Sequence, residues 1–330
     1  MSALVRSWRN FKRFSHLRMF GMAHVDRLPK YVKIVEVGPR DGLQNEPGHI
    51  IPTAVKVKLV NFLSNAGLQS IETAAFVSPK WVPQMADGAE VMKNIRRADG
   101  VQYPVLVPNI EGYRRAKLAG AEQVAVFASA SEAFSQKNIN CSIEESFQRF
   151  QPIITEALAT GISVRGYVSC IAGCPYSGHT NPNTVATITS RLVDMGCCEV
   201  SLGDTIGVGT PGIILDVLNA VTARVPIEKI AVHFHDTYGQ ALANILCALS
   251  AGVSIVDSSV AGLGGCPYAA GASGNVATED VLFMLNGMNI ETGVSMDKLL
   301  EATEYISKEL GRPPASRAAR ALLSKRSPAK

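Results

Sequence analysis

Apolar segments and segments of helical period alternate along most of the chain. Eight short segments rich in Val, Ile and other strand-forming residues recur at 33–38, 70–76, 103–108, 123–129, 163–169, 199–204, 230–236 and 254–260. The stretches between them, for example 54–67 and 142–161, repeat apolar residues at the spacing of an amphipathic helix. The pattern therefore predicts a strand followed by a helix, repeated eight times.

This order of elements predicts an α/β fold. Strands that are apolar on both faces and alternate with helices form parallel sheets covered by those helices. Eight such units close most naturally into a (β/α)8 barrel, the TIM barrel. A glycine also stands shortly before five of the strands, where the end of a helix needs a left-handed residue. We therefore expect a catalytic (β/α)8 TIM barrel with additional C-terminal helices over residues 28–311, with a doubly wound open sheet as the alternative.

Side chains capable of chemistry gather at the carboxyl ends of the predicted strands, where barrel enzymes have their active sites. They are Arg40 and Asp41 after the first strand, Glu72 in the second, Asp204 at the end of the sixth, and His233 and His235 in the seventh. After the eighth strand comes the glycine-rich segment 262–275, which contains Cys266 and Asn275. The predicted fold and the positions of these residues support each other.

The two histidines indicate a metal site. His233 and His235 are two positions apart on one strand, so both side chains point to the same face. Two inward imidazoles beside Asp41 favour a divalent cation over a pair of core histidines. Because the set lacks thiolates and Asn275 could supply an amide oxygen, it suits Mg2+ or Mn2+ better than a structural zinc.

The other side chains suit proton transfer and charge stabilisation. Cys266 lies among five glycines in fourteen positions. This composition predicts a loop that can approach a substrate, with the thiol as a candidate acid or base. Arg40 would bind an oxygen on which negative charge develops. Glu72 and Asp204 either hold a substrate hydroxyl or a metal-bound water, or form buried ion pairs with Arg40 or Arg165.

Composition and charge exclude some partners. Hydrophobic residues make up 47% and charged residues 18% of the 330 residues, and no apolar run is long enough to span a bilayer. Residues 1–24 carry five cations and residues 312–330 carry six, in both cases without an acid. Residues 25–311 then hold 21 cations against 28 acids, which argues against a nucleic-acid-binding surface. We expect neither a membrane nor a nucleic acid as a partner.

The basic segment at residues 1–27 has the composition of a mitochondrial transit peptide, because Ser, Phe, Leu and Trp separate its cations and allow an amphipathic helix. It predicts the mitochondrial matrix, with an untargeted cytoplasmic protein as the alternative. The odd count of seven cysteines argues against a disulfide framework and fits a reducing compartment. The basic residues 312–330 contain three prolines and are expected to form a disordered tail.

Five motifs along the chain resemble those of a known family. In order they are GPRDGLQNE (38–46), FVSPKWVPQ (76–84), SLGDTIGVGTPG (201–212), HFHDTYGQALAN (233–244) and GLGGCPYAAGASGN (262–275). Together they resemble the 3-hydroxy-3-methylglutaryl-CoA (HMG-CoA) lyases. The resemblance implies metal-dependent retro-Claisen cleavage of HMG-CoA to acetyl-CoA and acetoacetate, as in ketone body synthesis and leucine degradation. It also implies an acyl-CoA as the small-molecule partner and a homodimer.

The same resemblance implies a role for each candidate residue. Asp41, His233, His235 and Asn275 match the metal ligands of the family, Arg40 its substrate-binding and enolate-stabilising arginine, Cys266 its catalytic cysteine, and Glu72 and Asp204 its supporting acids. Asp41 and His233 both lie near enough by motif to take the proton of the tertiary alcohol.

Three alternative functions remain open. The nearest is a Claisen condensation in the same barrel superfamily, as in isopropylmalate synthase-like enzymes, although those usually carry further C-terminal domains. A catalytically silent binding barrel is disfavoured by Cys266 and the metal set. A G-x-G-x-x-G pattern at 207–212 suggests a nicotinamide oxidoreductase, but it lies in the sixth unit and the next strand supplies histidines instead of a ribose-binding acid.

Overall fold

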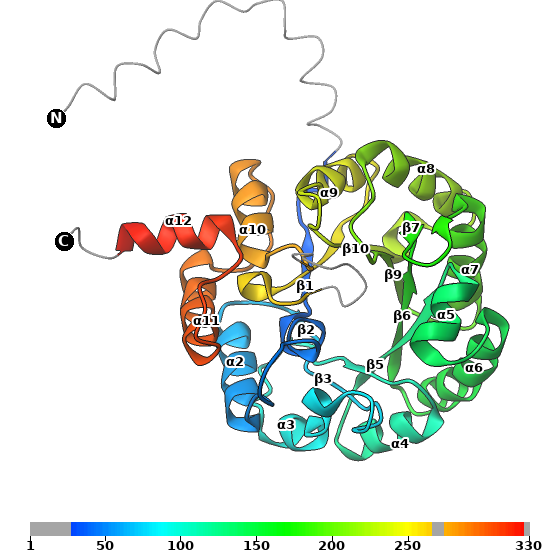
Figure 1. Ribbon diagram of the computed structural model, residues 1–330, viewed down its shortest axis with the longest axis horizontal. Helices are drawn as coiled ribbons and strands as arrows, with labels where there is room; N and C mark the ends of the chain where they lie inside the picture. The colour runs from blue at the N-terminus through cyan, green and yellow to red at the C-terminus, as the bar shows by residue number, and fades with distance from the viewer. Residues whose placement is uncertain (1–27, 266–273, 327–330) are drawn as a thin grey trace, which may run out of the picture.

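The computed structural model describes residues 28–265 and 274–326. In this part of the chain nine strands form one sheet in the order β2-β1-β11-β10-β9-β6-β5-β4-β3. Figure 1 shows the sheet at the centre of a ring of helices. The strands are β1 (Lys33–Glu36), β2 (Ser70–Ile71), β3 (Ala74–Ala75), β4 (Val105–Leu106), β5 (Gln123–Ser129), β6 (Ser163–Ser169), β9 (Glu199–Asp204), β10 (Ile230–Phe234) and β11 (Ile255–Ser258). All neighbouring pairs are parallel.

The sheet closes on itself through the second predicted strand. Within it, the amide of Glu72 donates to the carbonyl of Glu36 in β1 (2.8 Å), and the amide of Thr73 donates to the carbonyl of Pro104 next to β4 (3.0 Å). One predicted strand, 70–76, therefore supplies both β2, which pairs with β1, and β3, which pairs with β4. The expected (β/α)8 barrel is confirmed, and the open-sheet alternative is wrong.

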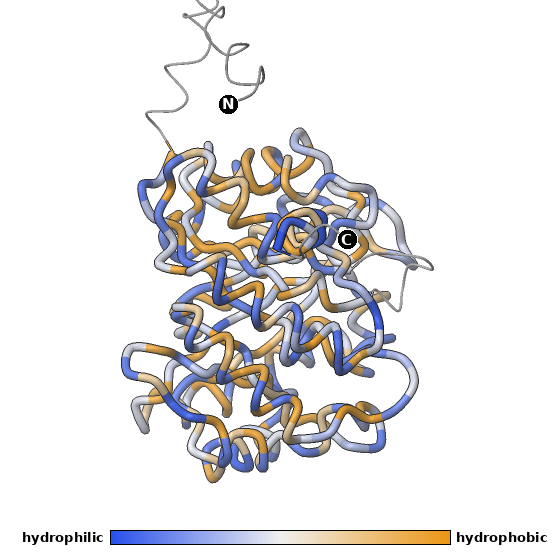
Figure 2. The backbone as a smooth tube through the Cα atoms, turned by 90° about the vertical axis from the view of Figure 1, so that its left-hand side faces the viewer, coloured by the Kyte–Doolittle hydropathy of each residue, from blue (hydrophilic) through white to orange (hydrophobic). Residues whose placement is uncertain are grey.

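Helices cover the outside of the barrel. They are α2 (Thr53–Asn65), α3 (Gly88–Asn94), α4 (Ile110–Leu118), α5 (Glu132–Ile139), α6 (Ile143–Ala159), α7 (Pro182–Asp194), α8 (Pro211–Thr222), α9 (Ala241–Ser250), α10 (Thr278–Gly287), α11 (Met296–Glu309) and α12 (Arg317–Arg326). Figure 2 shows hydrophobic and hydrophilic residues alternating along them, as helices with one buried face require. A short hairpin of β7 (Gly173–Cys174) and β8 (Gly178–His179) follows β6 and is not apparent from the sequence pattern.

Local signals explain where these elements start and stop. Helix α6 begins with a capping box, in which Ser142 and Glu145 each accept the other's backbone amide. The predicted glycines before strands have positive φ, and Gly196 before β9 shows why a side chain is excluded. Its φ is 114°, and a Cβ there would lie 2.6 Å from Leu158 of α6.

The additional C-terminal helices are confirmed, but the expectation of a disordered tail is wrong for most of its length. Residues 317–326 form α12. The carboxylate of Asp280 in α10 caps this helix, since it accepts the amide of Ala318 (2.7 Å) and the hydroxyl of Ser316 (2.8 Å). Ala319 is fully buried. A cap supplied by a distant residue gives no signal in the sequence of the tail itself.

Charged side chains fill part of the barrel interior below the site. Arg165 in β6 donates two hydrogen bonds to Asp257 in β11, at 2.6 and 3.0 Å, although three steps of strand order separate them. These bonds must therefore cross the lumen. Arg165 also donates to Glu199 in β9 (2.6 Å), and Lys33 in β1 donates to the same carboxylate (3.1 Å), so two cations compensate two carboxylates. Among the described residues, no helix combines the length and the hydropathy that crossing a bilayer requires.

Candidate active site

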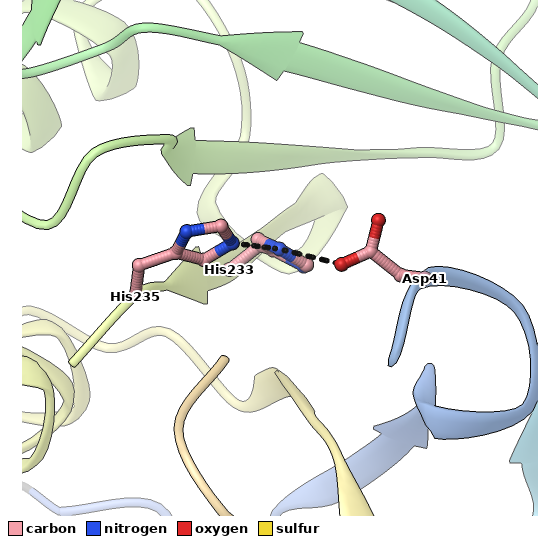
Figure 3. A group of neighbouring side chains, drawn as sticks. All are labelled: Asp41, His233 and His235. Carbon is pink, nitrogen blue, oxygen red and sulfur yellow. Dashed lines mark hydrogen bonds and ion pairs between the residues drawn. The ribbon is translucent and has the colours of Figure 1, made fainter. Parts of the chain in front are cut away.

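Three sequence-predicted residues converge at the carboxyl end of the barrel strands. His233 lies in β10, His235 directly follows that strand, and Asp41 comes from the turn η3 (Gly38–Gly42) after β1. Figure 3 shows the two imidazoles and the carboxylate in a row. Nε2 of His233 lies 3.3 Å from Nε2 of His235 and 3.9 Å from Oδ2 of Asp41. One ligand atom from each residue lies within 4.8 Å of the others.

Strand alternation places the histidines. Phe234 between them is 1% exposed and packs in the outer apolar core, so its two neighbours point into the barrel. The predicted fourth residue, Asn275, lies against the same cluster, because it pairs with His235 by a backbone bridge and its Nδ2 donates to Oδ2 of Asp41 (2.8 Å). The structure therefore brings all four predicted metal ligands together.

The donor set fits a divalent cation. Burial, assisted by the charge of His233, lowers the pKa of His235 to about 4, so this imidazole keeps its lone pair free near neutral pH. Burial alone would raise the pKa of Asp41, but Arg40 and the two histidines outweigh it and hold that pKa well below its usual range. Two imidazole nitrogens and a carboxylate that face one another at these distances are typical ligands of a first-row or alkaline-earth cation.

A residue that the sequence analysis missed orients His233. Asp257 in β11 is 1% exposed, and its Oδ2 lies 3.3 Å from Nδ1 of His233. The same carboxylate accepts from Arg165 and from the hydroxyl of Ser201 (2.9 Å). Burial would raise the pKa of Asp257, but Arg165 lowers it to about 2. The carboxylate thus fixes the ring with Nε2 toward Asp41. The sequence signal that could have identified Asp257 is an acidic residue inside an otherwise apolar strand.

Burial and the partners of His233 act against each other. Burial disfavours the imidazolium, yet the hydrogen bond to Asp257 and the charge of Asp41 outweigh it and raise the pKa of His233. Tyr167 lies edge-on to this ring, with 6.2 Å between the ring centroids. His233 is therefore the one histidine of the pair that two carboxylates stabilise in its charged form.

Arg40 connects the cluster to Glu72. Its Nε donates to Oε2 of Glu72 (2.7 Å), and its Nη1 donates to Oδ1 of Asp41 (2.7 Å). Arg40 is 6% and Glu72 0% exposed, so this is a buried ion pair, one of the two roles expected for Glu72. Oε1 of Glu72 is buried without a hydrogen-bond partner among the described residues. Glu72 therefore orients the guanidinium and keeps one oxygen available.

Asp204 is attached to its own loop. Its Oδ2 accepts the amide of Gly209 (2.8 Å), and among the described residues it forms no ion pair with Arg40 or Arg165. A Cβ on Gly209 would lie 2.8 Å from Oδ2 of Asp204, and this contact explains a glycine of the G-x-G-x-x-G pattern without a dinucleotide. Burial raises the pKa of Asp204 to about 6.

Cys266 lies outside the described residues, so its position stays a prediction. The flanking residues are described and lie beside the cluster. A Cβ on Gly264 would be 2.8 Å from Nδ2 of Asn275, and one on Gly274 would be 2.7 Å from the carbonyl oxygen of Gly264. The two ends of the segment that contains Cys266 therefore meet next to Asn275.

A closed parallel barrel with two histidines and a carboxylate converging at its carboxyl end is the architecture of a (β/α)8-barrel enzyme with a candidate divalent-metal centre. The family model described as HMGL-like matches residues 31–306, and the chain belongs to this family.

Relatives and solved structures named HMG-CoA lyase match nearly the whole chain. The mitochondrial HMG-CoA lyase of Macaca fascicularis is 61% identical over 305 residues, which are 92% of this chain and 94% of that protein. The crystal structure of the Pseudomonas aeruginosa HMG-CoA lyase has a TM-score of 0.89 at 57% identity and covers 91% of this chain and 99% of its own. A lyase from Acinetobacter baumannii, solved with coenzyme A and 3-methylmalate, has a TM-score of 0.85 at 34% identity and covers 88% and 95%.

Proposed function

We propose that the protein cleaves HMG-CoA to acetyl-CoA and acetoacetate at the cluster around Asp41. The observation that carries this function is the convergence of Asp41, His233 and His235 beside Arg40 at the carboxyl end of an HMGL-like barrel. The activity is that of a carbon–carbon lyase, in agreement with the relatives. The neighbour solved with coenzyme A supports an acyl-CoA substrate.

The activity is tested by incubating the purified protein with HMG-CoA and Mg2+ and measuring acetoacetate and acetyl-CoA. We expect both products in equal amounts. Protein that forms neither, but condenses an acyl-CoA with a keto acid or oxidises a nicotinamide, would overturn the proposal in favour of one of the alternatives.

Asp41, His233, His235 and Asn275 would hold the cation, as Mg2+ or Mn2+. Oδ2 of Asp41 and the Nε2 atoms of the histidines already face one another. Asn275 presents its amide to Asp41 and would contribute its oxygen after rotation of the amide group, whose two ends are assigned from hydrogen bonding. When bound, a divalent cation polarises the oxygen atoms of a hydroxyl and a carbonyl and so makes the alcohol more acidic.

We expect His235→Ala to lower the affinity for Mg2+ and Mn2+ by about 10-fold to 100-fold, because the substitution deletes a proposed metal ligand. The fold should persist, because the hydrophobic core does not depend on this imidazole. Titration with Mn2+ followed by electron paramagnetic resonance measures the affinity directly. The exposed His179 provides the matched control, His179→Ala, with the parent affinity. An unchanged affinity in folded His235→Ala would remove this residue from the site.

Asp41 is the proposed acceptor of the alcohol proton. Nδ1 of His233 is engaged by Asp257, and its Nε2 is the atom assigned to the cation. Nε2 has only one lone pair, whereas each carboxylate oxygen has two, so Oδ2 of Asp41 can bind the cation and still accept a proton. This oxygen lies 3.9 Å from Nε2 of His233, on the side of the cluster that faces Asn275. Since the pKa of Asp41 is held low, it is a weak base and requires an acidified alcohol.

Arg40 and Cys266 complete the reaction. As the alkoxide collapses to the ketone of acetoacetate, the carbon–carbon bond breaks and its electron pair moves into a thioester enolate. Arg40 donates from Nε to Glu72 and from Nη1 to Asp41, and its remaining N–H groups are proposed to stabilise the enolate oxygen. Cys266 is proposed to deliver the proton to the enolate carbon, giving acetyl-CoA. Glu72 and Asp204 are proposed as supporting acids, through Arg40 and through the loop after β9 respectively.

A mitochondrial location is proposed, and the name of the macaque relative, a mitochondrial HMG-CoA lyase, supports it. Residues 1–27 lie outside the described part of the chain, so their role as the targeting segment is a proposal.

A homodimer is proposed from the family resemblance. A mass twice that of the 35.2 kDa chain, measured by sedimentation equilibrium, would support it.

We expect residues 1–27, fused to a fluorescent reporter, to direct it into mitochondria, because they combine basic residues with an amphipathic pattern. Replacing the five cations of residues 1–24 by glutamine is the matched control and should leave the reporter cytosolic. A diffuse signal from the unaltered fusion would exclude the address, and loss of lyase activity on deleting the segment would assign it a structural role.

A further inference from the structure

One buried carboxylate joins three segments that frame the candidate site. Glu36 at the end of β1 is 0% exposed. Its Oε1 accepts hydrogen bonds from the amides of Gly38 and Val260, both at 2.8 Å, and its Oε2 accepts from the hydroxyl of Thr278 at 2.6 Å. It forms no ion pair within the described ranges, so hydrogen bonds alone hold it.

Each of the three donors begins a segment that carries part of the site. Gly38 opens η3, the turn with the arginine and the aspartate of the cluster. Val260 opens the turn η6 (Val260–Gly262), which leads into the glycine-rich segment. Thr278 opens α10, three positions after Asn275. Figure 1 shows β1 and α10 side by side, although 242 residues separate Glu36 from Thr278.

Two of these segments, η3 and η6, pack tightly against each other. A Cβ on Gly38 would lie 2.6 Å from Oε1 of Glu36. A Cβ on Gly42, at the other end of η3, would lie 2.8 Å from both Oγ of Ser259 and Cβ of Leu263. A Cβ on Gly38 would also lie 3.0 Å from Cγ1 of Val260, so η3 touches η6 and its flanking residues at both ends. In such close packing, we expect a change in the Glu36 side chain to shift one turn relative to the other.

We propose that Glu36 is a positioning residue of the lyase, which fixes Asp41 relative to Asn275 and to the base of the glycine-rich segment. The inference rests on the proposed function of that cluster. Buried polar groups in a low-dielectric interior are costly unless every partner is satisfied, so losing this carboxylate would leave the amides of Gly38 and Val260 without acceptors. The two turns would then separate or rotate, and the ligands they carry would lose their mutual geometry.

The proposal predicts different effects for variants that keep the shape of the Glu36 side chain and for variants that shorten it. Burial, only partly offset by the donated hydrogen bonds, raises the pKa of Glu36 to about 8, so a neutral side chain of the same shape suits this place. Glu36→Gln keeps one oxygen for the two amides and an N–H for the hydroxyl of Thr278, and should retain activity. Glu36→Asp is shorter by one methylene and cannot reach all three partners. Glu36→Ala removes them altogether.

We expect Glu36→Asp and Glu36→Ala to lower kcat and Mn2+ affinity by about 10-fold to 100-fold, the usual effect of losing a group that orients metal ligands. The KM for HMG-CoA should change less than kcat. Glu36→Gln should be close to the parent in both measurements. Gly38→Ala, which drives a methyl group into Oε1, should reproduce the Glu36→Asp values without altering the carboxylate.

A core variant far from the junction controls for lost stability. Ile154 is 0% exposed in α6, which packs on β5 and β6 on the opposite side of the barrel. Ile154→Ala should lower the midpoint of thermal unfolding but keep the parent kcat and Mn2+ affinity at temperatures where it is folded. If the Glu36→Asp and Gly38→Ala proteins match Ile154→Ala in both measurements, Glu36 is merely structural and the proposal is wrong.

The acetoacetate assay and the Mn2+ titration together distinguish the proposed lyase function from the positioning role of Glu36. A parent protein that forms no acetoacetate overturns the proposed function. Weaker Mn2+ binding in Glu36→Asp and Gly38→Ala, with recovery in Glu36→Gln, would still support the positioning role. Failure of Glu36→Gln to recover binding would contradict it.

Discussion

Replacing Cys266 by serine is expected to lower turnover about 100-fold to 10,000-fold while HMG-CoA still binds. Serine keeps the size and a weak hydrogen bond of the thiol but is far less acidic, so the step that suffers is protonation of the enolate carbon. Steady-state kinetics should show the loss in kcat, with little change in KM. Tritium or deuterium uptake into acetyl-CoA from labelled solvent should fall in parallel.

A second cysteine provides the control for this experiment. Cys198 is exposed and lies before β9, at the opposite end of that strand from Asp204, so Cys198→Ser should keep the parent activity. A thiol reagent should inactivate the parent and the Cys198→Ser protein alike, and substrate with Mg2+ should slow the inactivation. Full activity of Cys266→Ser would transfer the search for the acid to the inward-facing histidines.

Asp41→Asn is expected to reduce kcat by about 100-fold or more, with a smaller rise in KM. Asparagine preserves the shape of the side chain but removes the charge that faces Arg40 and His233. It therefore weakens the cation site, removes the proposed base and leaves the Arg40 guanidinium with only Glu72 as its anionic partner. Saturating Mg2+ should restore part of the loss, and the remainder measures the role as a base.

The control is an exposed aspartate at the end of α7. Asp194→Asn should leave both kinetic constants unchanged, because Asp194 is exposed and accepts a hydrogen bond from Ser190 of its own helix (3.3 Å). Near-normal turnover of Asp41→Asn at low Mg2+ would show that Asp41 is neither ligand nor base. The proton of the alcohol would then have to go to His233, which the sequence alone leaves as the other candidate.

The barrel could be predicted because its signals are local. Three predicted strands, 123–129, 163–169 and 199–204, coincide with β5, β6 and β9 residue for residue. Their apolar runs and the glycines before them act within a few positions along the chain. The closure of the sheet through residues 70–76 was implied by the number of units, although the split of that segment into two short strands was not.

The convergence of Asp41, His233 and His235 was predictable for a related reason. Strand alternation puts His233 and His235 on one face, and the barrel brings the carboxyl ends of all strands to one side, so Asp41 must lie near them. The residue types and their spacing were therefore enough to predict that these three side chains lie together. The resemblance to the HMG-CoA lyases then supplied roles that spacing cannot give, such as that of Cys266.

Local sequence patterns were enough to predict the repeated unit, the face on which each strand residue lies and the end of the barrel that holds the candidate site. The partner of each buried charge became clear only from the folded chain. Arg40 pairs with Glu72, Asp257 with His233, and Glu36 with two turns and α10. The folded chain also shows that residues 317–326 are a helix capped by Asp280. Periodicity acts within one element, whereas these contacts join residues tens to hundreds of positions apart, and a buried polar group selects its partner by distance in space.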